Sequence, residues 1–370
     1  MGSDQARKAA LRRTLLAARA AVPPGEAEAA ARRLARRALE LPELTGARTV
    51  AAYVSVGREP GTRELLAELR ARGTAVLLPV LLADGDLDWA ECGGPDALRA
   101  AGGTGPGTPA VPPRRLVLPA VRPDPARLHR YAAVCGFPDD GRLPATYPHV
   151  VAFPLAMSLM AARDFPFPLL GLVHVANRVE QLRPVDAGAR LTYAVATGPA
   201  QPHPGGTAFA VTAQARLGGE TVWRSTSTYL SRGPGTGTRT AGPGTADLTV
   251  PSRRESWQLP GSLGRSYAAA SGDRNPIHLH PLAARLFGFR RAIAHGMWTK
   301  ARCLAALATE LPGAYAVDVA FRAPVLLPTT VRFRAERAGQ AEHSGDAWAF
   351  DVRAADGARE HLRGTVAPLP

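Results

Sequence analysis

An acidic and an imidazole side chain lie close together in the segment Ser-Gly-Asp-Arg-Asn-Pro-Ile-His, which runs from Ser271 to His278. Its glycine, asparagine and proline favour a turn, and turns expose side chains instead of burying them. Asp273 and His278 together could hold a water molecule, take a proton from it and return a proton elsewhere. The spacing therefore predicts general acid–base chemistry on a bound water.

A second block follows in the order Ala294, His295, Gly296, Met297. Gly296 opens a helical pattern, where a backbone N–H can face a developing oxyanion with no side chain in the way. The two blocks together predict an acid–base pair with an oxyanion donor. The other notable positions in these blocks are expected to bind substrate or to hold the loop: Ser271, Asn275, His295 and Met297.

Both blocks resemble the hydratase motif of the MaoC-like, R-specific enoyl-thioester hydratases and dehydratases. That motif reads Ser-Gly-Asp-x-Asn-Pro-x-His and then Ala-His-Gly-Met, and every fixed position is present here. The resemblance implies a hot-dog fold and reversible hydration of a trans-2-enoyl thioester, carried by CoA or acyl carrier protein, to an R-3-hydroxyacyl thioester. In this interpretation Asp273 and His278 bind the water, and the Gly296 N–H holds the enolate oxygen.

No cofactor or metal is expected for this reaction, because the thioester itself acidifies C2. The pair His278 and His280 could ligate a metal, but Pro281 follows, and His280 is better interpreted as the N-cap of a short helix. Two alternatives to the hydratase remain at this point: a non-catalytic acyl-thioester binding protein and a hot-dog thioesterase.

An internal repeat occupies residues 114–370. Tyr131–Phe137 aligns with Tyr267–Asp273, and Val175–Arg178 aligns with Val319–Arg322. Between these blocks, Tyr147–His149 lies near the place of Ile293–His295. Each copy continues with a helical apolar pattern, at Val151–Ala161 in the first and at Met297–Glu310 in the second. Alternating runs typical of antiparallel strands follow in each copy. We predict an α+β double hot-dog fold, with two antiparallel sheets each wrapped around a long helix and joined into one continuous sheet.

The two copies differ where the chemistry is expected. Phe137 and Arg142 stand in the first copy at the positions of Asp273 and His278. Residues 114–232 are therefore predicted to be a non-catalytic hot-dog and residues 253–370 the catalytic one, with a linker at 233–252. Double-hot-dog relatives with one degenerate half take longer acyl groups, so the resemblance implies a medium or long acyl chain.

The N-terminal segment, residues 1–92, is predicted to be a truncated α/β unit. Strand, helix and strand patterns at Thr49–Val54, Thr62–Arg72 and Ala75–Leu82 indicate a βαβ unit with a parallel pair. It resembles the first half of a 5-formyltetrahydrofolate cyclo-ligase at the following positions: Lys8, Arg12, Val50–Tyr53, Gly57, Glu59, Pro60, Thr62, Leu77–Val80 and Asp86–Trp89.

The glycine-rich block of the second half of that family is missing from this sequence. Residues 93–113 are instead rich in glycine, proline and alanine, as in a linker. We interpret the segment as an inactive relic, with residual folate or ATP binding as the alternative.

The net charge is +14, yet Lys8 and Lys300 are the only lysines. The excess is arginine, and no nucleic-acid-binding motif accompanies it, so we attribute it to coding bias and expect no nucleic-acid partner.

No apolar run is long enough to span a membrane, and no signal peptide is recognisable. We expect a cytoplasmic enzyme of fatty-acid or polyketide-type metabolism, and leave a homodimer open. Three scattered cysteines indicate no disulfide framework: Cys92, Cys135 and Cys303.

Overall fold

The computed structural model describes residues 14, 21–55, 61–81, 87–91, 110–162, 164–169, 171–233, 248, 251–337 and 347–370. These residues divide into two compact units, one within residues 1–107 and the other within residues 108–370. Several positions of the cyclo-ligase resemblance lie outside the described residues, as does one cysteine: Lys8, Arg12, Gly57, Glu59, Pro60, Asp86 and Cys92.

The smaller unit contains a short sheet with helices. Its elements are α2 (Pro24–Leu39), α3 (Pro42–Thr45), β1 (Thr49–Ala51), α4 (Arg63–Ala71), β2 (Ala75–Leu81) and β3 (Leu87–Glu91). Strands β1 and β2 run parallel, which confirms the predicted parallel pair, and β3 adds an antiparallel strand. Leu66 and Leu69 of α4 are fully buried against Val76 of β2, so the amphipathic face of this helix supplies the core.

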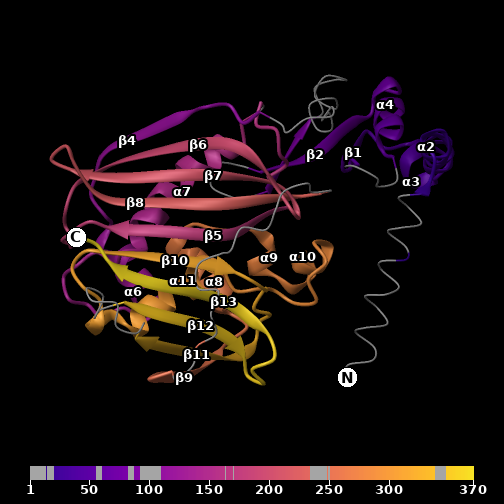
Figure 1. Ribbon diagram of the computed structural model, residues 1–370. Helices are drawn as coiled ribbons and strands as arrows, with labels where there is room; N and C mark the ends of the chain where they lie inside the picture. The colour runs from indigo at the N-terminus through magenta and orange to yellow at the C-terminus, as the bar shows by residue number, and fades with distance from the viewer. Residues whose placement is uncertain are drawn as a thin grey trace. The chain divides into compact units, whose positions relative to one another are not determined.

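The larger unit is built on one ten-stranded antiparallel sheet in the order β4-β6-β7-β8-β5-β10-β13-β12-β11-β9 (Figure 1). From either edge to the centre, the strands follow the same order in sequence: β4-β6-β7-β8-β5 from one edge and β9-β11-β12-β13-β10 from the other. The two halves of the sheet therefore repeat one topology. The α+β class with a large antiparallel sheet is therefore confirmed, and the two predicted sheets are halves of one. The strands are β4 (Arg115–Val121), β5 (Leu172–Gln181), β6 (Leu191–His203), β7 (Gly206–Leu217), β8 (Glu220–Arg232), β9 (Arg253–Leu259), β10 (Tyr315–Phe321), β11 (Thr329–Arg337), β12 (Trp348–Ala354) and β13 (Glu360–Pro368).

The helices of the larger unit are α6 (Pro125–Cys135), α7 (Tyr147–Met160), α8 (Leu263–Ser271), α9 (Pro276–Leu279), α10 (Pro281–Leu286) and α11 (Gly296–Ala306). In the view of Figure 1, α7, α8 and α11 overlap the strands of the sheet, whereas α9 and α10 lie to the right of the strand ends. Helix α7 begins four residues before the predicted start at 151, because Pro148 fits its first turn. Helix α11 ends at Ala306, earlier than the predicted Glu310, and a single 3₁₀ turn covers Ala308–Glu310.

The repeat is visible in how α6 and α8 end. Each ends at a glycine in the left-handed conformation, Gly136 and Gly272, both with φ of 82°. The residue after the glycine is Phe137 in the first copy and Asp273 in the second, as the alignment predicted. The rings of Tyr131 and Tyr267 lie 5.9 Å apart, so the repeated helices pack against each other.

The two halves meet where β5 pairs with β10, with Ala176 opposite Ala320. Lys300 of α11 is fully buried at this junction. Its Nζ donates to Asn177 Oδ1 at 2.6 Å, to Asn177 O at 3.1 Å and to Val317 O at 3.1 Å. Three acceptors match the three protons of an ammonium group, so Lys300 ties its helix to both halves of the sheet.

Candidate active site

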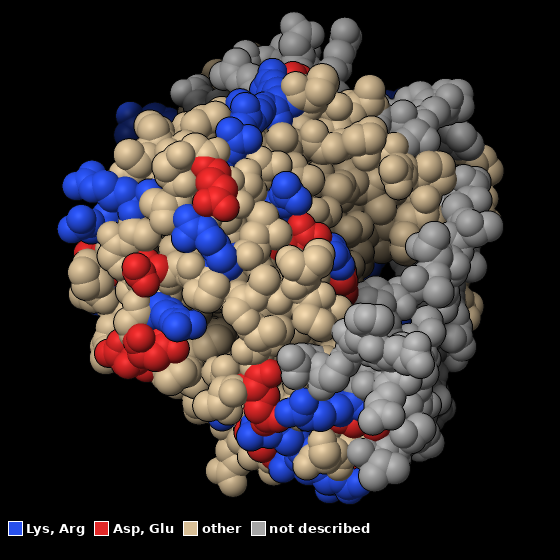
Figure 2. Space-filling model, turned by 60° about the vertical axis from the view of Figure 1, so that its left-hand side comes forward, with Lys and Arg blue, Asp and Glu red and all other residues tan. Residues whose placement is uncertain are grey.

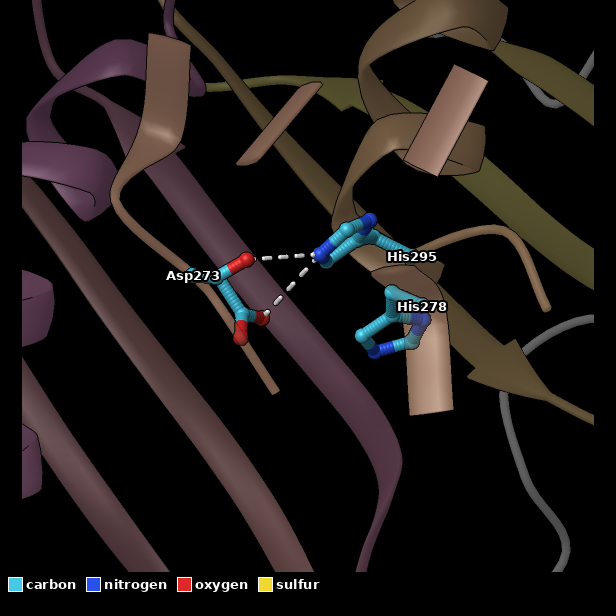
Figure 3. A group of neighbouring side chains, drawn as sticks. All are labelled: Asp273, His278 and His295. Carbon is cyan, nitrogen blue, oxygen red and sulfur yellow. Dashed lines mark hydrogen bonds and ion pairs between the residues drawn. The ribbon is translucent and has the colours of Figure 1, made fainter. Parts of the chain in front are cut away.

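Asp273, His278 and His295 converge at one place in the second half (Figure 3). Asp273 lies in the turn after α8, His278 lies in α9, and His295 is the N-cap of α11. One side-chain ligand atom from each residue lies within 4.8 Å of the others. The structure therefore brings together the two residues predicted to do acid–base chemistry, and adds His295 beside them.

The turn that presents Asp273 is fixed by its own polar side chains. The Asp273 N–H donates to Ser271 Oγ at 3.1 Å, and Asp273 Oδ1 accepts from the Asn275 N–H at 3.2 Å. Asn275 Oδ1 in turn caps α9 by accepting from the Ile277 N–H at 3.3 Å. Ser271 and Asn275 thus hold the loop, and a direct contact of either with substrate stays a prediction.

His278 is arranged as a proton acceptor. Its Nδ1 lies 2.8 Å from the carbonyl oxygen of Ile293, so Nδ1 carries the proton that it donates there and Nε2 carries the lone pair. Burial lowers the pKa of His278, and the opposing charge of Asp273 only partly offsets this. A lowered pKa keeps the imidazole neutral near pH 7, the form that can take a proton.

His295 positions Asp273. Its Nε2 donates to the Asp273 carbonyl oxygen at 3.0 Å and lies 3.8 Å from the Asp273 carboxylate. Burial lowers the pKa of His295 to about 3, so the carboxylate contact is not an ion pair at neutral pH. His295 is 2% exposed and Met297 is 8% exposed, so neither presents much surface, and their predicted contacts with substrate remain predictions.

Stacking couples the two imidazoles. The rings of His278 and His295 lie 3.7 Å apart between centroids, at 24° to one another. His278 further lowers the pKa of His295, because protonating one ring places a charge against the other. The stack therefore favours a neutral pair.

Gly296 begins α11, so its N–H has no intrahelical acceptor. A Cβ built on it would lie 2.9 Å from Cε1 of Phe321. Only glycine fits this close approach without moving the aromatic ring. The open N–H and the close ring are what an oxyanion donor beside an apolar wall requires.

Gly264 sets the position of His278. A Cβ on Gly264 would lie 2.0 Å from the carbonyl oxygen of His278, so α8 and α9 touch there through backbone alone. Gly264→Ala is expected to displace α9, to lower stability by about 1–3 kcal/mol and to reduce turnover, as thermal denaturation and assay would measure. Gly261→Ala is the matched control, since its nearest neighbour would lie 3.7 Å away; equal behaviour of the two variants would contradict this role.

Residues of the first half also reach the site, and sequence reasoning missed them. The ring of His174 lies 4.9 Å from that of Phe321 and 4.7 Å from that of Tyr229. His149 stacks on His174 at 6.3 Å. Burial lowers the pKa of His149 and raises that of Tyr229, and the negative charge of Asp273 acts upward on both pKa values. Both residues therefore lie within the electrostatic reach of Asp273. The alignment of His149 with His295 was the one available signal.

Burial keeps three site histidines neutral, lowering the pKa of His149 to about 4 and those of His174 and His295 to about 3 from 6.5. Between about pH 6.5 and 4 the unfolded chain therefore binds protons that the folded chain does not. Stability must fall as pH falls through this window, by up to about 1.4 kcal/mol per pH unit for each histidine. Thermal denaturation between pH 7 and 5 should show a steep drop in Tm; a flat Tm would contradict the buried neutral rings.

The cluster of Asp273, His278 and His295 has the composition of a metal site. One ring nitrogen of each histidine already makes a hydrogen bond: His278 Nδ1 with Ile293 O, and His295 Nε2 with Asp273 O. The expectation that no metal takes part stays a prediction. His280, the other residue considered for metal, accepts from the Leu282 N–H at 3.2 Å, which confirms its interpretation as an N-cap.

Charge is mixed on the face drawn in Figure 2, where basic and acidic side chains are interspersed among uncharged ones. Arginine–carboxylate pairs account for several of the basic groups in the described part of the chain, such as Arg334 with Asp351 and Arg253 with Glu310. Among the described residues, no helix combines the length and apolar character needed to cross a membrane.

Comparison with known proteins gives two family matches. A model described as a MaoC like domain matches residues 251–353, and one described as the 5-formyltetrahydrofolate cyclo-ligase family matches residues 4–117. The chain is 34% identical over 283 residues to 3-hydroxyacyl-thioester dehydratase X of Mycobacterium tuberculosis, covering 74% of this chain and 96% of that protein. It is 42% identical over 74 residues to 3-hydroxybutyryl-CoA dehydratase of Methylorubrum extorquens, covering 19% of this chain and 47% of that protein.

Solved structures match the larger part of the chain. The crystal structure of HtdX from Mycobacterium tuberculosis superposes with a TM-score of 0.59 at 32% identity, covering 69% of this chain and all of that one. A MaoC-like dehydratase from Phytophthora capsici gives a TM-score of 0.59 at 19% identity, covering 70% of this chain and 96% of that one. The second likeness concerns the fold alone.

Proposed function

The chain belongs to the MaoC-like dehydratase family, with an N-terminal segment of the 5-formyltetrahydrofolate cyclo-ligase family, and from this premise we propose that it hydrates trans-2-enoyl thioesters reversibly to R-3-hydroxyacyl thioesters. The observation that carries the proposal is the meeting of Asp273 with a neutral His278 beside the open N–H of Gly296. The larger unit is proposed to be a double hot-dog, whose second half holds these residues.

In the proposed hydration a water molecule lies between the Asp273 carboxylate and His278 Nε2. One of these groups takes a proton from the water as its oxygen bonds to C3 of the enoyl thioester. The C2–C3 π electrons then pass toward the thioester carbonyl, and the enolate oxygen accepts a hydrogen bond from the Gly296 N–H. A proton delivered to C2 completes the addition, so that water is consumed and no redox cofactor is required.

The lone pair of His278 at Nε2 is the better candidate for the first proton transfer. Its Nδ1–H is already engaged with Ile293 O, which fixes the tautomer and leaves Nε2 as the acceptor. Asp273 would then orient the water and stabilise the imidazolium that forms. The reverse reaction removes the C2 proton and expels water through the same groups.

A graded series of trans-2-enoyl-CoA substrates tests the proposal through the loss of the enoyl absorbance on hydration. Product formed with R configuration at C3 would support it. Binding of these thioesters without turnover would instead favour a non-catalytic acyl-binding protein, and release of free CoA would favour a thioesterase. The same series carried on acyl carrier protein compares the two carriers, and varying the chain length tests the preference for medium or long acyl groups.

The N-terminal segment is proposed to be dispensable for hydration and inactive as a cyclo-ligase. Removing residues 1–109 retains Val111, which is buried in the core of the larger unit, and Pro112, whose carbonyl accepts from Thr197 Oγ1 at 2.7 Å. The shortened protein is expected to keep most hydratase activity. A folded but inactive truncation would contradict this, as would ATP-dependent cyclisation of 5-formyltetrahydrofolate by the full chain.

A further inference from the structure

A row of aromatic rings leads from Gly296 into the first half of the larger unit. Phe321 lies against Gly296, His174 lies 4.9 Å from Phe321, and His149 lies 6.3 Å from His174. An acyl chain that entered the first half from the Gly296 N–H would meet this row. For an unsubstituted alkyl chain such a row is unexpected, because desolvating imidazole costs free energy that an apolar side chain would not.

A bulge in β5 places His174 on this side of the sheet. His174 pairs with Tyr229 and Asn177 pairs with Ser227, with a register shift between His174 and Ala176. Tyr229 and Ser227 are two residues apart in β8, so their side chains lie on the same face of the sheet. Their partners in β5, His174 and Asn177, therefore lie on that face too, although they are three residues apart. Without the extra residue His174 would point to the other face, and bulges of this kind commonly aim a side chain at a site.

His149 is enclosed by neighbouring side chains, but its ring nitrogens, unlike Nε2 of His174, are not fully buried. Its side chain is half-buried and makes ring contacts with Phe153 at 6.4 Å and with His174. Its ring nitrogens have no hydrogen bond to any residue in the described part of the chain, and they are not among the buried nitrogens that lack a partner. They are therefore open to a bound molecule.

The chemistry of His149 selects the group that it would bind. Burial and the charge of Lys300 lower the pKa of His149 to about 4, so the ring is neutral at pH 7 and unsuited to pairing with a carboxylate. A neutral imidazole has one donor and one acceptor nitrogen. A hydroxyl group, which both donates and accepts, satisfies either nitrogen in either tautomer.

We propose that His149 binds a hydroxyl group on the acyl chain of the substrate, several carbons beyond C3. The proposal rests on the hydratase function proposed above and names its substrate class: enoyl thioesters that carry a hydroxyl group along the chain. One net hydrogen bond to a neutral partner corresponds to roughly a tenfold preference in kcat/KM. The first half then contributes chain recognition and the second half the chemistry.

The test compares trans-2-decenoyl-CoA with its 7-hydroxy and 9-hydroxy derivatives on the full-length protein. The wild type is expected to hydrate one hydroxylated substrate with a kcat/KM about tenfold higher than the unsubstituted one. His149→Phe should remove this preference by lowering kcat/KM for the hydroxylated substrate alone. His149→Gln, which keeps a donor and an acceptor, should retain most of it.

Equal rates on hydroxylated and unsubstituted chains by the wild type would overturn the proposal, and this result needs no variant to fold. So would a His149→Phe variant that loses the same factor on both substrates. If the wild type hydrates none of the three thioesters, the hydratase function itself fails, whereas turnover without preference removes only the role of His149.

Discussion

Asp273→Asn is expected to lower kcat by about 10²–10⁴-fold, the usual contribution of a positioned acid–base group. Asparagine keeps the volume and the Oδ1 that accepts from the Asn275 N–H, so the turn should survive. It lacks the negative charge that orients the water and offsets the charge formed on His278. Steady-state kinetics with an enoyl-CoA substrate measures the loss, and Tm should change little because the Asp273 side chain is 27% exposed.

The first half offers a matched control for this substitution. Asp140 accepts from the Arg142 N–H at 3.0 Å, which is the same local contact in the copy that lacks the proposed acid–base pair. Asp140→Asn should therefore leave kcat unchanged. Near wild-type turnover by Asp273→Asn would remove the proposed mechanism and move the acyl-binding alternative to first place.

The double variant Asp273→Asn, His278→Gln extends the same argument. Both groups act on one water molecule, so once one is lost the other has little left to contribute. The combined loss should be close to that of the more damaging single change. Multiplicative losses would mean that the two residues act in separate steps.

The sequence could predict that the proposed acid–base residues lie close together because their relation is local. Asp273 and His278 belong to one turn and one short helix, and glycine, asparagine and proline determine that turn whatever surrounds it. Gly296 was predictable for a similar reason, since a helix start is a local signal. The alternation of apolar and polar residues along each strand is also a local pattern, and it predicted the large antiparallel sheet.

The long-range contacts between the two halves could not be predicted from local sequence. His174 reaches the site because of a bulge in β5, and Lys300 is buried because β5 pairs with β10. Both are long-range consequences of pairing, and a one-residue shift in register would reverse which side chains face the helices. Lys300 was noticed only as one of two lysines in an arginine-rich chain, and its three acceptors lie on strands far from it in sequence.

Gly296→Pro is expected to lower kcat by about 10²–10³-fold, the cost of removing one oxyanion donor. Proline is tolerated at the first position of a helix, where its missing N–H has no intrahelical partner. The residue before proline must be extended, and His295 already has φ of −66° and ψ of 135°. The substitution therefore removes the donor while α11 can still form.

Gly296→Ala separates the loss of the N–H from the added side chain. Both variants place a Cβ against the Phe321 ring, where it would lie 2.9 Å from Cε1, but alanine keeps the N–H. The ratio of kcat between the alanine and proline variants isolates the hydrogen bond and should itself be on the order of 10²–10³. Similar kcat values for the two would show that close packing against Phe321, and not the N–H of Gly296, is what the site requires of this glycine; the enolate oxygen would then need a different donor.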